Sequence, residues 1–234
     1  MTSKLTMQTD RPDRLEQFPD FPPRDDMQNI LYLYQPSYLV ALARHLGHRD
    51  TTLVFGEIPV YWYPSRYARI PDLLVAFNID PAAAISRNGY SIEEHSKPPD
   101  FVLEVASPTT TRNDYTQKRE DYAAFGILEY WRFDPTGGRW YDAPLAGDRL
   151  VDGAYQPIGV QQSAEGHMSG RSDALGLDVC WENGRLRWRI PESGRYLETH
   201  EEEAEARIAA EGRAASAEAR VQELEAELRR REAP

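Results

Sequence analysis

The chain has 234 residues, of which 41% are apolar and 11% aromatic, so it can bury a core of ordinary size. Its 38 acidic residues outnumber the 27 lysines and arginines, and the formal charge of −11 argues against a protein that coats nucleic acid through general basic charge. The single cysteine excludes a disulfide framework and a thiolate metal site, and no apolar run approaches the roughly 20 residues of a membrane span. These features predict a folded cytoplasmic protein with no membrane segment.

The N-terminal part of the chain divides into an arm and the beginning of a domain. Residues 1–29 carry four prolines among charged residues without hydrophobic periodicity, which predicts a mobile N-terminal arm. Residues 30–196 are expected to form the domain. Within it, residues 37–47 have the leucine spacing of a helix, and residues 51–65 alternate as one bent strand or two short strands do.

Two apolar runs in the middle of the chain each contain a carboxylate. Asp72 lies in RIPDLLVAF and Glu104 in DFVLEVAS, and both runs predict strands buried on at least one face. An unpaired carboxylate there would lose several kcal/mol on desolvation, so each must be paired, hydrogen-bonded, protonated or bound to a metal ion. The connection between the runs, residues 79–100, is expected to be a long polar loop near the site.

A helix predicted over residues 113–126 follows the second run. Asp114, Lys118 and Tyr122 recur on it every four residues, which places them on one face. The helix can therefore direct a cation toward the two strand carboxylates.

Short strands follow this helix. Residues 128–135 and 139–145 flank a Pro-Thr-Gly-Gly turn, and residues 177–190 predict a second hairpin around Asn183-Gly184.

The composition changes abruptly at residue 197. Residues 197–234 are rich in Glu, Ala and Arg and predict one long charged helix. Apolar residues recur along it at alternating steps of four and three, as in the seam of a short coiled coil: Ala210, Ala214, Ala217, Val221, Leu224 and Leu228. A homodimer formed through this seam and a solvated single helix are both compatible with the pattern.

Asp72, Glu104 and Lys118 together are suited to metal-assisted hydrolysis of a phosphodiester. Two carboxylates on adjacent strands supply hard oxygen ligands for Mg²⁺, which takes its remaining ligands from water and substrate phosphate. The metal ion would neutralise charge at phosphorus and lower the pKa of a bound water, while an ammonium stabilises the same charge. The alternative is a structural ion pair between either carboxylate and Lys118 or Arg112.

The run PDLLVAF, followed by PPDFVLEVASPTTTRNDYTQKREDYAAFGILEYWRFDP, resembles the Uma-type family of restriction-endonuclease-like proteins, a branch of the PD-(D/E)XK nuclease superfamily. The resemblance is densest from Arg69 to Pro135, and GRLRWRIPESGRYLETHEEEAEAR resembles the family's passage into a charged C-terminal helix. It implies an α/β fold of the mixed α+β kind. The expected architecture is a restriction-endonuclease-like mixed central sheet flanked by helices, with extra β-hairpins and a long C-terminal helix.

The resemblance also implies roles for individual residues. Asp72 and Glu104 would bind Mg²⁺ or Mn²⁺ together with the backbone carbonyl of Val105, and Lys118 would be the catalytic lysine. Asp114 and Tyr122 would line the helix beside this site.

Three other residues are candidates for accessory or substrate-binding roles. Glu57, at the bend of segment 51–65, is either an accessory acidic group of the site or a solvent-facing residue of an edge strand. Arg69 and Arg112 flank the site in sequence and would contribute to a basic rim that binds substrate phosphate, together with Arg66, Arg87 and Lys97.

The sequence departs from the common superfamily signature at Ala106, which stands two residues beyond Glu104 where an E-x-K pattern has its lysine. Lys118 instead lies on the following helix, a migration for which the Uma-type branch is known. The function expected is therefore that of a Mg²⁺- or Mn²⁺-dependent endodeoxyribonuclease with DNA as its substrate. The alternatives are hydrolysis of another phosphoester, or a catalytically idle protein of the same fold that assembles through its C-terminal helix.

Overall fold

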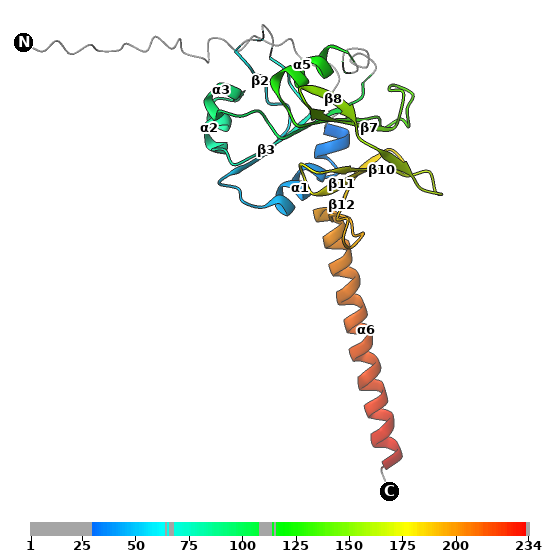
Figure 1. The fold of residues 1–234 in the computed structure, drawn as a ribbon. Helices are drawn as coiled ribbons and strands as arrows, with labels where there is room; N and C mark the ends of the chain where they lie inside the picture. The colour runs from blue at the N-terminus through cyan, green and yellow to red at the C-terminus, as the bar shows by residue number, and fades with distance from the viewer. Residues whose placement is uncertain (1–29, 64, 66–67, 108–113, 115, 233–234) are drawn as a thin grey trace, which may run out of the picture. The chain divides into compact units, whose positions relative to one another are not determined.

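The structure is a computed structural model that describes residues 30–63, 65, 68–107, 114 and 116–232, so the predicted N-terminal arm lies outside the described residues. Across the described part of the chain, no helix is both long and apolar enough to cross a membrane. The elements in chain order (Figure 1) are η2 (Ile30–Tyr34), α1 (Tyr38–Leu46), β1 (Thr52–Phe55), β2 (Val60–Tyr61), β3 (Leu73–Phe77), α2 (Pro81–Ser86), β4 (Tyr90–Ser91), α3 (Ile92–His95), β5 (Phe101–Val105), α5 (Gln117–Phe125), β6 (Glu129–Phe133), β7 (Leu145–Val151), β8 (Ala154–Pro157), β9 (Val160–Gln162), β10 (Met168–Ser172), β11 (Leu177–Glu182), β12 (Arg185–Arg189) and α6 (His200–Glu232).

A six-stranded mixed sheet with the order β1-β3-β5-β6-β7-β8 is the centre of the domain. The pair β5 and β6 runs parallel, and α5 lies in the crossover that a parallel pair requires. The other four neighbouring pairs run antiparallel. The mixed central sheet expected from the sequence is thereby confirmed.

Both faces of this sheet are covered. Successive side chains of a strand point to opposite faces, and in β3 and β5 they enter two different apolar clusters. One cluster includes side chains of α1 and of the four-stranded sheet β12-β11-β10-β9, and the other includes side chains of α2, α3 and α5. The apolar runs around Asp72 and Glu104 are nearly continuous because the strands are buried on both sides.

The connection between β3 and β5 differs from the prediction. Residues 79–100 were expected to form a polar loop, but they contain α2, β4 and α3. Asp80 caps α2, because its side chain accepts a hydrogen bond from the backbone N–H of Ala82 at 3.0 Å, and Pro81 occupies the first helical position. These short elements have too few residues for a periodic pattern to stand out in the sequence.

The predicted hairpins form with one change of boundary. β11 and β12 pair around Asn183-Gly184, and both turn residues have positive φ, as the sequence predicts. After β6, however, the return strand begins at Leu145 and not at residue 139, because residues 134–141 fold into a loop.

The helix predicted over residues 113–126 is also shorter than expected. α5 begins at Gln117, because Thr116 has φ −113° and ψ −87°, values outside the helical region. Asp114 therefore precedes α5 and is not part of it. Gly126 ends the helix in the left-handed conformation.

Residues 198–234 form a unit separate from the preceding residues. The unit contains α6, a single helix of 33 residues (Figure 1), so the predicted long C-terminal helix is confirmed. A capping box begins it: the Thr199 backbone N–H donates to Glu202 Oε2 at 2.9 Å, and the Glu202 backbone N–H donates to Thr199 Oγ1 at 3.3 Å.

Candidate active site

Asp72 and Glu104 lie opposite each other at the ends of adjacent strands. β3 and β5 pair with Leu73 opposite Leu103, so the next position in the same register sets Asp72 against Glu104. Side chains directly opposite each other in a sheet share one face, with Cβ atoms about 5 Å apart. Both residues are 1% exposed, and both lie on the sheet face that α5 covers. The two carboxylates are therefore close together and shielded from water.

The backbone of Val105 faces the same place. Its N–H donates a hydrogen bond to Asp72 Oδ2 at 2.7 Å. In an extended strand the N–H and the carbonyl of one residue point to the same edge, so the Val105 carbonyl is also directed toward Asp72.

Lys118 reaches the carboxylates from α5. Its Nζ atom lies 2.8 Å from Glu104 Oε2 and 2.7 Å from Asp114 Oδ1, and the residue is 8% exposed. Burial alone would lower the pKa of Lys118, but the charges of Glu104, Asp114 and Asp72 raise it above its ordinary value. Lys118 is therefore held as a cation between two buried carboxylates.

Tyr122, one turn further along α5, holds the other oxygen of Glu104. Its hydroxyl donates to Glu104 Oε1 at 2.6 Å. Burial raises the pKa of Glu104, the charge of Lys118 opposes this effect and the charges of Asp72 and Asp114 add to it, so that the pKa is about 8. A divalent cation between Asp72 and Glu104 would lower this pKa, because it favours the ionised carboxylate.

Tyr141 completes the group and was not identified from the sequence. It is 2% exposed, and its hydroxyl donates to Asp114 Oδ2 at 2.5 Å. Asp114 is itself fully buried, and its backbone carbonyl accepts a hydrogen bond from the Tyr130 hydroxyl at 2.9 Å. A chain of contacts therefore runs from Tyr141 through Asp114 and Lys118 to Glu104.

Asp134 shapes the loop that delivers Tyr141. Its Oδ2 accepts hydrogen bonds from the backbone N–H groups of Trp140 and Tyr141, each at 2.8 Å, and its Oδ1 accepts one from Thr136 N–H at 2.7 Å. These bonds replace a strand ladder with a compact turn directly after β6. The sequence predicts a strand over residues 139–145 from their apolar pattern. The hydrogen bonds to Asp134 that hold the first of these residues in a loop cannot be recognised from that pattern.

Of the other predicted site residues, Glu57 and Arg69 are described by the structure and Arg112 is not. The exposed residue Glu57 has a positive φ of 56°, and its N–H donates to the Pro71 carbonyl at 3.1 Å, so its backbone lies beside Asp72. Arg69 donates from Nε to Asp121 Oδ2 at 2.6 Å and so joins the chain before β3 to α5. Arg112 lies outside the described residues.

The donor set fits a hard divalent cation that keeps part of its water shell. The described residues contain no group of three or more His, Cys, Asp or Glu side chains arranged to hold a metal ion. Two carboxylates and one carbonyl remain as candidates, and Mg²⁺ commonly binds through one or two carboxylates plus water and substrate phosphate. Each carboxylate oxygen has two lone pairs, so Glu104 can bind a cation and still accept its present hydrogen bonds.

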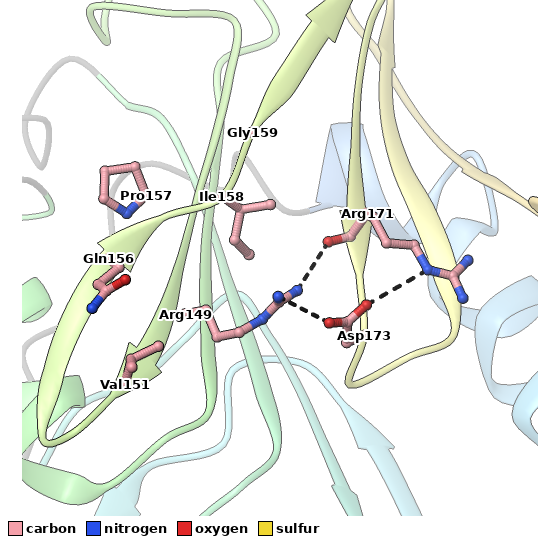
Figure 2. Close-up of a pocket in the computed structure, with 8 residues that line it drawn as sticks. All are labelled: Arg149, Val151, Gln156, Pro157, Ile158, Gly159, Arg171 and Asp173. Atoms are coloured by element: carbon pink, nitrogen blue, oxygen red, sulfur yellow. Dashed lines mark hydrogen bonds and ion pairs between the residues drawn. The ribbon is translucent and has the colours of Figure 1, made fainter.

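A pocket of about 300 Å³ lies elsewhere in the domain (Figure 2). Arg149 of β7 extends there toward Asp173 and the carbonyl of Arg171, with ion-pair and hydrogen-bond distances of 2.9 Å and 3.4 Å. It also lies 3.3 Å from the buried carboxylate of Glu129, which pairs in register with Phe101 at the far end of β5 from Glu104. The pocket is therefore separate from the carboxylate site, and Arg149 joins the two sheets there.

The model of the Uma2 family, described as "Putative restriction endonuclease", matches residues 36–179. No curated protein gives a significant match. Among solved structures, the chain is similar to one titled as a putative nuclease belonging to DUF820 from Anabaena variabilis, with 14% identity, a TM-score of 0.38 and coverage of 60% of this chain and 73% of that one. Because the family model spans more than half of the sequence, the chain belongs to the Uma2 family of restriction-endonuclease-like proteins.

Proposed function

We propose that the chain is a divalent-metal-dependent nuclease that hydrolyses phosphodiester bonds of DNA. The observation that carries the proposal is the juxtaposition of buried Asp72 and Glu104 with the ammonium of Lys118, 2.8 Å from Glu104. The chain belongs to a family that is described as "Putative restriction endonuclease", and this membership supports nucleic acid as the substrate class.

Each residue has a distinct part in this proposal. Asp72, Glu104 and the Val105 carbonyl would hold Mg²⁺ or Mn²⁺. When bound, the ion supplies a Lewis acid for the phosphate and lowers the pKa of a coordinated water. Lys118 keeps a positive charge where the phosphate accumulates negative charge, and Tyr122 fixes the orientation of Glu104.

Substrate contacts are proposed for Arg69 and Arg112. Arg69 is paired with Asp121, so its guanidinium is held at a fixed position beside α5. Phosphate contacts of this kind give DNA affinity a steep dependence on salt, and removal of one arginine–phosphate pair reduces the slope of log K against log[salt] by about 0.9. Measurement of this slope in wild type and Arg69→Ala tests whether Arg69 binds phosphate.

A competing function is that of a catalytically idle protein with the same fold. The observation that favours it is that both oxygens of Glu104 are already engaged, Oε1 by Tyr122 and Oε2 by Lys118. In that case the group would be a buried structural network, and the protein would act through assembly.

Calorimetric titration of Mn²⁺ separates these two functions without knowledge of the substrate. We expect one binding event in wild type and none in an Asp72→Asn, Glu104→Gln double variant. Asp152→Asn, Glu192→Gln changes the net charge equally at exposed positions and is expected to bind as wild type does. Absence of binding in wild type, with a short DNA duplex present, would support the idle fold.

Cleavage of supercoiled plasmid DNA tests the reaction itself. We expect nicking or linearisation with Mg²⁺ or Mn²⁺, none with a chelator, and a loss of at least about 100-fold in Lys118→Met, since a transition-state charge contact is typically worth that much. Metal binding without cleavage of DNA would redirect the proposal to another phosphoester.

A further inference from the structure

α6 presents a line of exposed apolar side chains along one face. Val221, Leu224 and Leu228 are 52%, 47% and 60% exposed, although their spacing of three and four residues places them side by side. Three alanines continue the line toward the N-terminal end, at positions 210, 214 and 217. Since these side chains lie in a helix that forms a unit of its own, the line is available to a partner helix.

The line corresponds to the a and d positions of a heptad repeat. Ala214, Val221 and Leu228 occupy a, and Ala210, Ala217 and Leu224 occupy d. A β-branched residue at a with leucine at d favours two strands over three or four. The adjacent pair Val221 and Leu224 meets this condition, so the preferred partner is one other helix.

Flanking charges identify that helix as a second copy of α6. In a parallel pair, each g residue faces the e residue five positions later on the partner. Arg213 and Arg220 occupy g, and the residues they would face are Glu218 and Glu225. A homodimer repeats both contacts by symmetry, which gives four attractive pairs across the seam.

The same charges disfavour an antiparallel pair. Antiparallel helices bring g toward g and e toward e, which would place arginine against arginine and glutamate against glutamate. We propose that α6 associates with α6 of a second copy as a parallel, in-register, two-stranded coiled coil.

Contacts within one helix do not compete strongly with this arrangement. Arg220 pairs with Glu223 at 2.5 Å and Arg229 with Glu225 at 3.7 Å, but all four side chains are more than half exposed. Exposed i,i+3 and i,i+4 pairs contribute little to stability, so Arg220 and Glu225 can reorient across the seam. Glu227 at g would face the partner's Glu232 near the helix end, the one repulsive contact in the pattern.

Sedimentation equilibrium of the full chain is the first test. We expect wild type to form a dimer at protein concentrations of about 100 µM or below. In Leu224→Lys the dissociation constant of the dimer should be at least about tenfold larger than in wild type. Ile208→Lys is the matched control, because Ile208 is 64% exposed on the same helix but lies off the seam. A monomeric wild type, or a dimer that Leu224→Lys leaves intact, would overturn the proposal.

Charge reversal tests the choice of partner without altering the apolar seam. The variant Arg213→Glu, Arg220→Glu has only acidic g and e contacts in its own dimer, and the variant Glu218→Arg, Glu225→Arg has only basic ones. Each variant alone is expected to be monomeric, whereas an equimolar mixture restores all four attractive contacts and forms a heterodimer. Equal dimerisation of the separate variants would contradict the assignment of e and g.

Orientation is tested with Ala217→Cys. A parallel, in-register pair places residue 217 against its own copy at a core position, within disulfide distance. The native Cys180 is buried, so oxidation should cross-link the variant and leave wild type unlinked. Failure of a dimeric Ala217→Cys protein to cross-link would exclude the parallel register.

None of these measurements depends on catalysis, so the coiled coil and the nuclease activity are tested separately.

Discussion

The least expected contact of the candidate site is the hydrogen bond from Tyr141 to Asp114. Lys118 has a long flexible side chain, and holding it between two carboxylates restricts it to one place. Asp114 can hold Lys118 only if the carboxylate is itself oriented, and the Tyr141 hydroxyl orients it from the opposite side. We therefore expect Tyr141 to be a positioning residue, which acts on the candidate site through Asp114 and Lys118.

Tyr141→Phe removes this hydrogen bond and leaves the ring in place. We expect kcat for DNA cleavage to fall about tenfold or more, the effect usual for a supporting contact of a metal site, while Mn²⁺ affinity and KM change by less than about twofold. Steady-state kinetics measures kcat and KM, and calorimetry measures the Mn²⁺ affinity. Tyr196→Phe is the control, because the Tyr196 hydroxyl donates to Glu182 in another part of the domain. A rise in KM with unchanged kcat would contradict the positioning role.

Asp148 provides a test of electrostatics away from the carboxylate site. It is 2% exposed and accepts hydrogen bonds from Arg119 at 2.9 Å and 3.1 Å, and Arg132 lies 2.8 Å away. Burial alone would raise the pKa of Asp148, but the hydrogen bond from Arg119 and the charge of Arg132 lower it below its ordinary value. A carboxylate with a depressed pKa stabilises the fold above its ordinary pKa, and this contribution is lost as the pH falls toward the folded-state pKa.

Asp148→Asn should accordingly lower the free energy of unfolding by about 3 kcal/mol at pH 7, because it removes the buried negative charge that pairs with Arg132 and Arg119. The difference from wild type should narrow below about pH 4, where Asp148 becomes protonated on unfolding. Urea unfolding at several pH values measures both. Asp152→Asn makes the same charge change in an exposed turn and should unfold like wild type. A constant difference at every pH would show that the ionised carboxylate is not what stabilises the fold.

Among the elements, β6 connects the central sheet to the second sheet through Trp131. The indole lies against two backbones, because a Cβ atom added to Gly147 of β7 or to Gly170 of β10 would lie 2.8 Å from Trp131 ring atoms. Glu129 reinforces the same contact by accepting hydrogen bonds from Trp131 Nε1 and from Ser172 at the end of β10. A rigid ring between two glycines fixes the separation of the sheets.

Gly170→Ala inserts a methyl group into this contact. We expect the free energy of unfolding to fall by about 1–3 kcal/mol, because the fully buried indole cannot move away. Gly159→Ala is the control, since nothing lies within 4 Å of the added Cβ and the position needs no left-handed backbone. Chemical denaturation of both variants measures the effect. Equal stability of the two variants would mean that the sheets can separate at low cost.

The sequence predicted best the elements whose structure follows from the hydrophobic pattern of their own residues. β3 and β5 were predicted because each is apolar on both faces, and Asp72 and Glu104 were noticed because a charge inside such a run needs a partner. The strand predicted over residues 139–145 was wrong up to Pro144, because Asp134 holds residues 134–141 in a loop through hydrogen bonds to backbone groups, which a hydrophobic pattern does not reveal. Tyr141 was missed because it lies 27 residues from Asp114 along the chain. The catalytic roles of Asp72, Glu104 and Lys118 stay predictions until metal binding and cleavage are measured.

At the scale of the whole molecule, two units of different character follow each other along the chain. The domain up to Leu197 is stabilised by two apolar clusters on the faces of one sheet. α6 has almost no buried surface of its own, so within one chain its helical state depends on local propensity and its capping box. The acidic charge that argued against general nucleic-acid binding lies partly on α6, which contains ten glutamates.

The difference in aromatic content between the two units has a practical use in spectroscopy. All five tryptophans lie between residues 62 and 188, and α6 contains no tryptophan, tyrosine or phenylalanine. α6 nevertheless has 33 helical residues, more than α1, α2, α3 and α5 together. Indole fluorescence therefore reports on the domain alone, whereas α6 makes the largest single contribution to circular dichroism at the helical band. Melting curves recorded by the two signals on one intact sample will distinguish the unfolding of the domain from that of the helix.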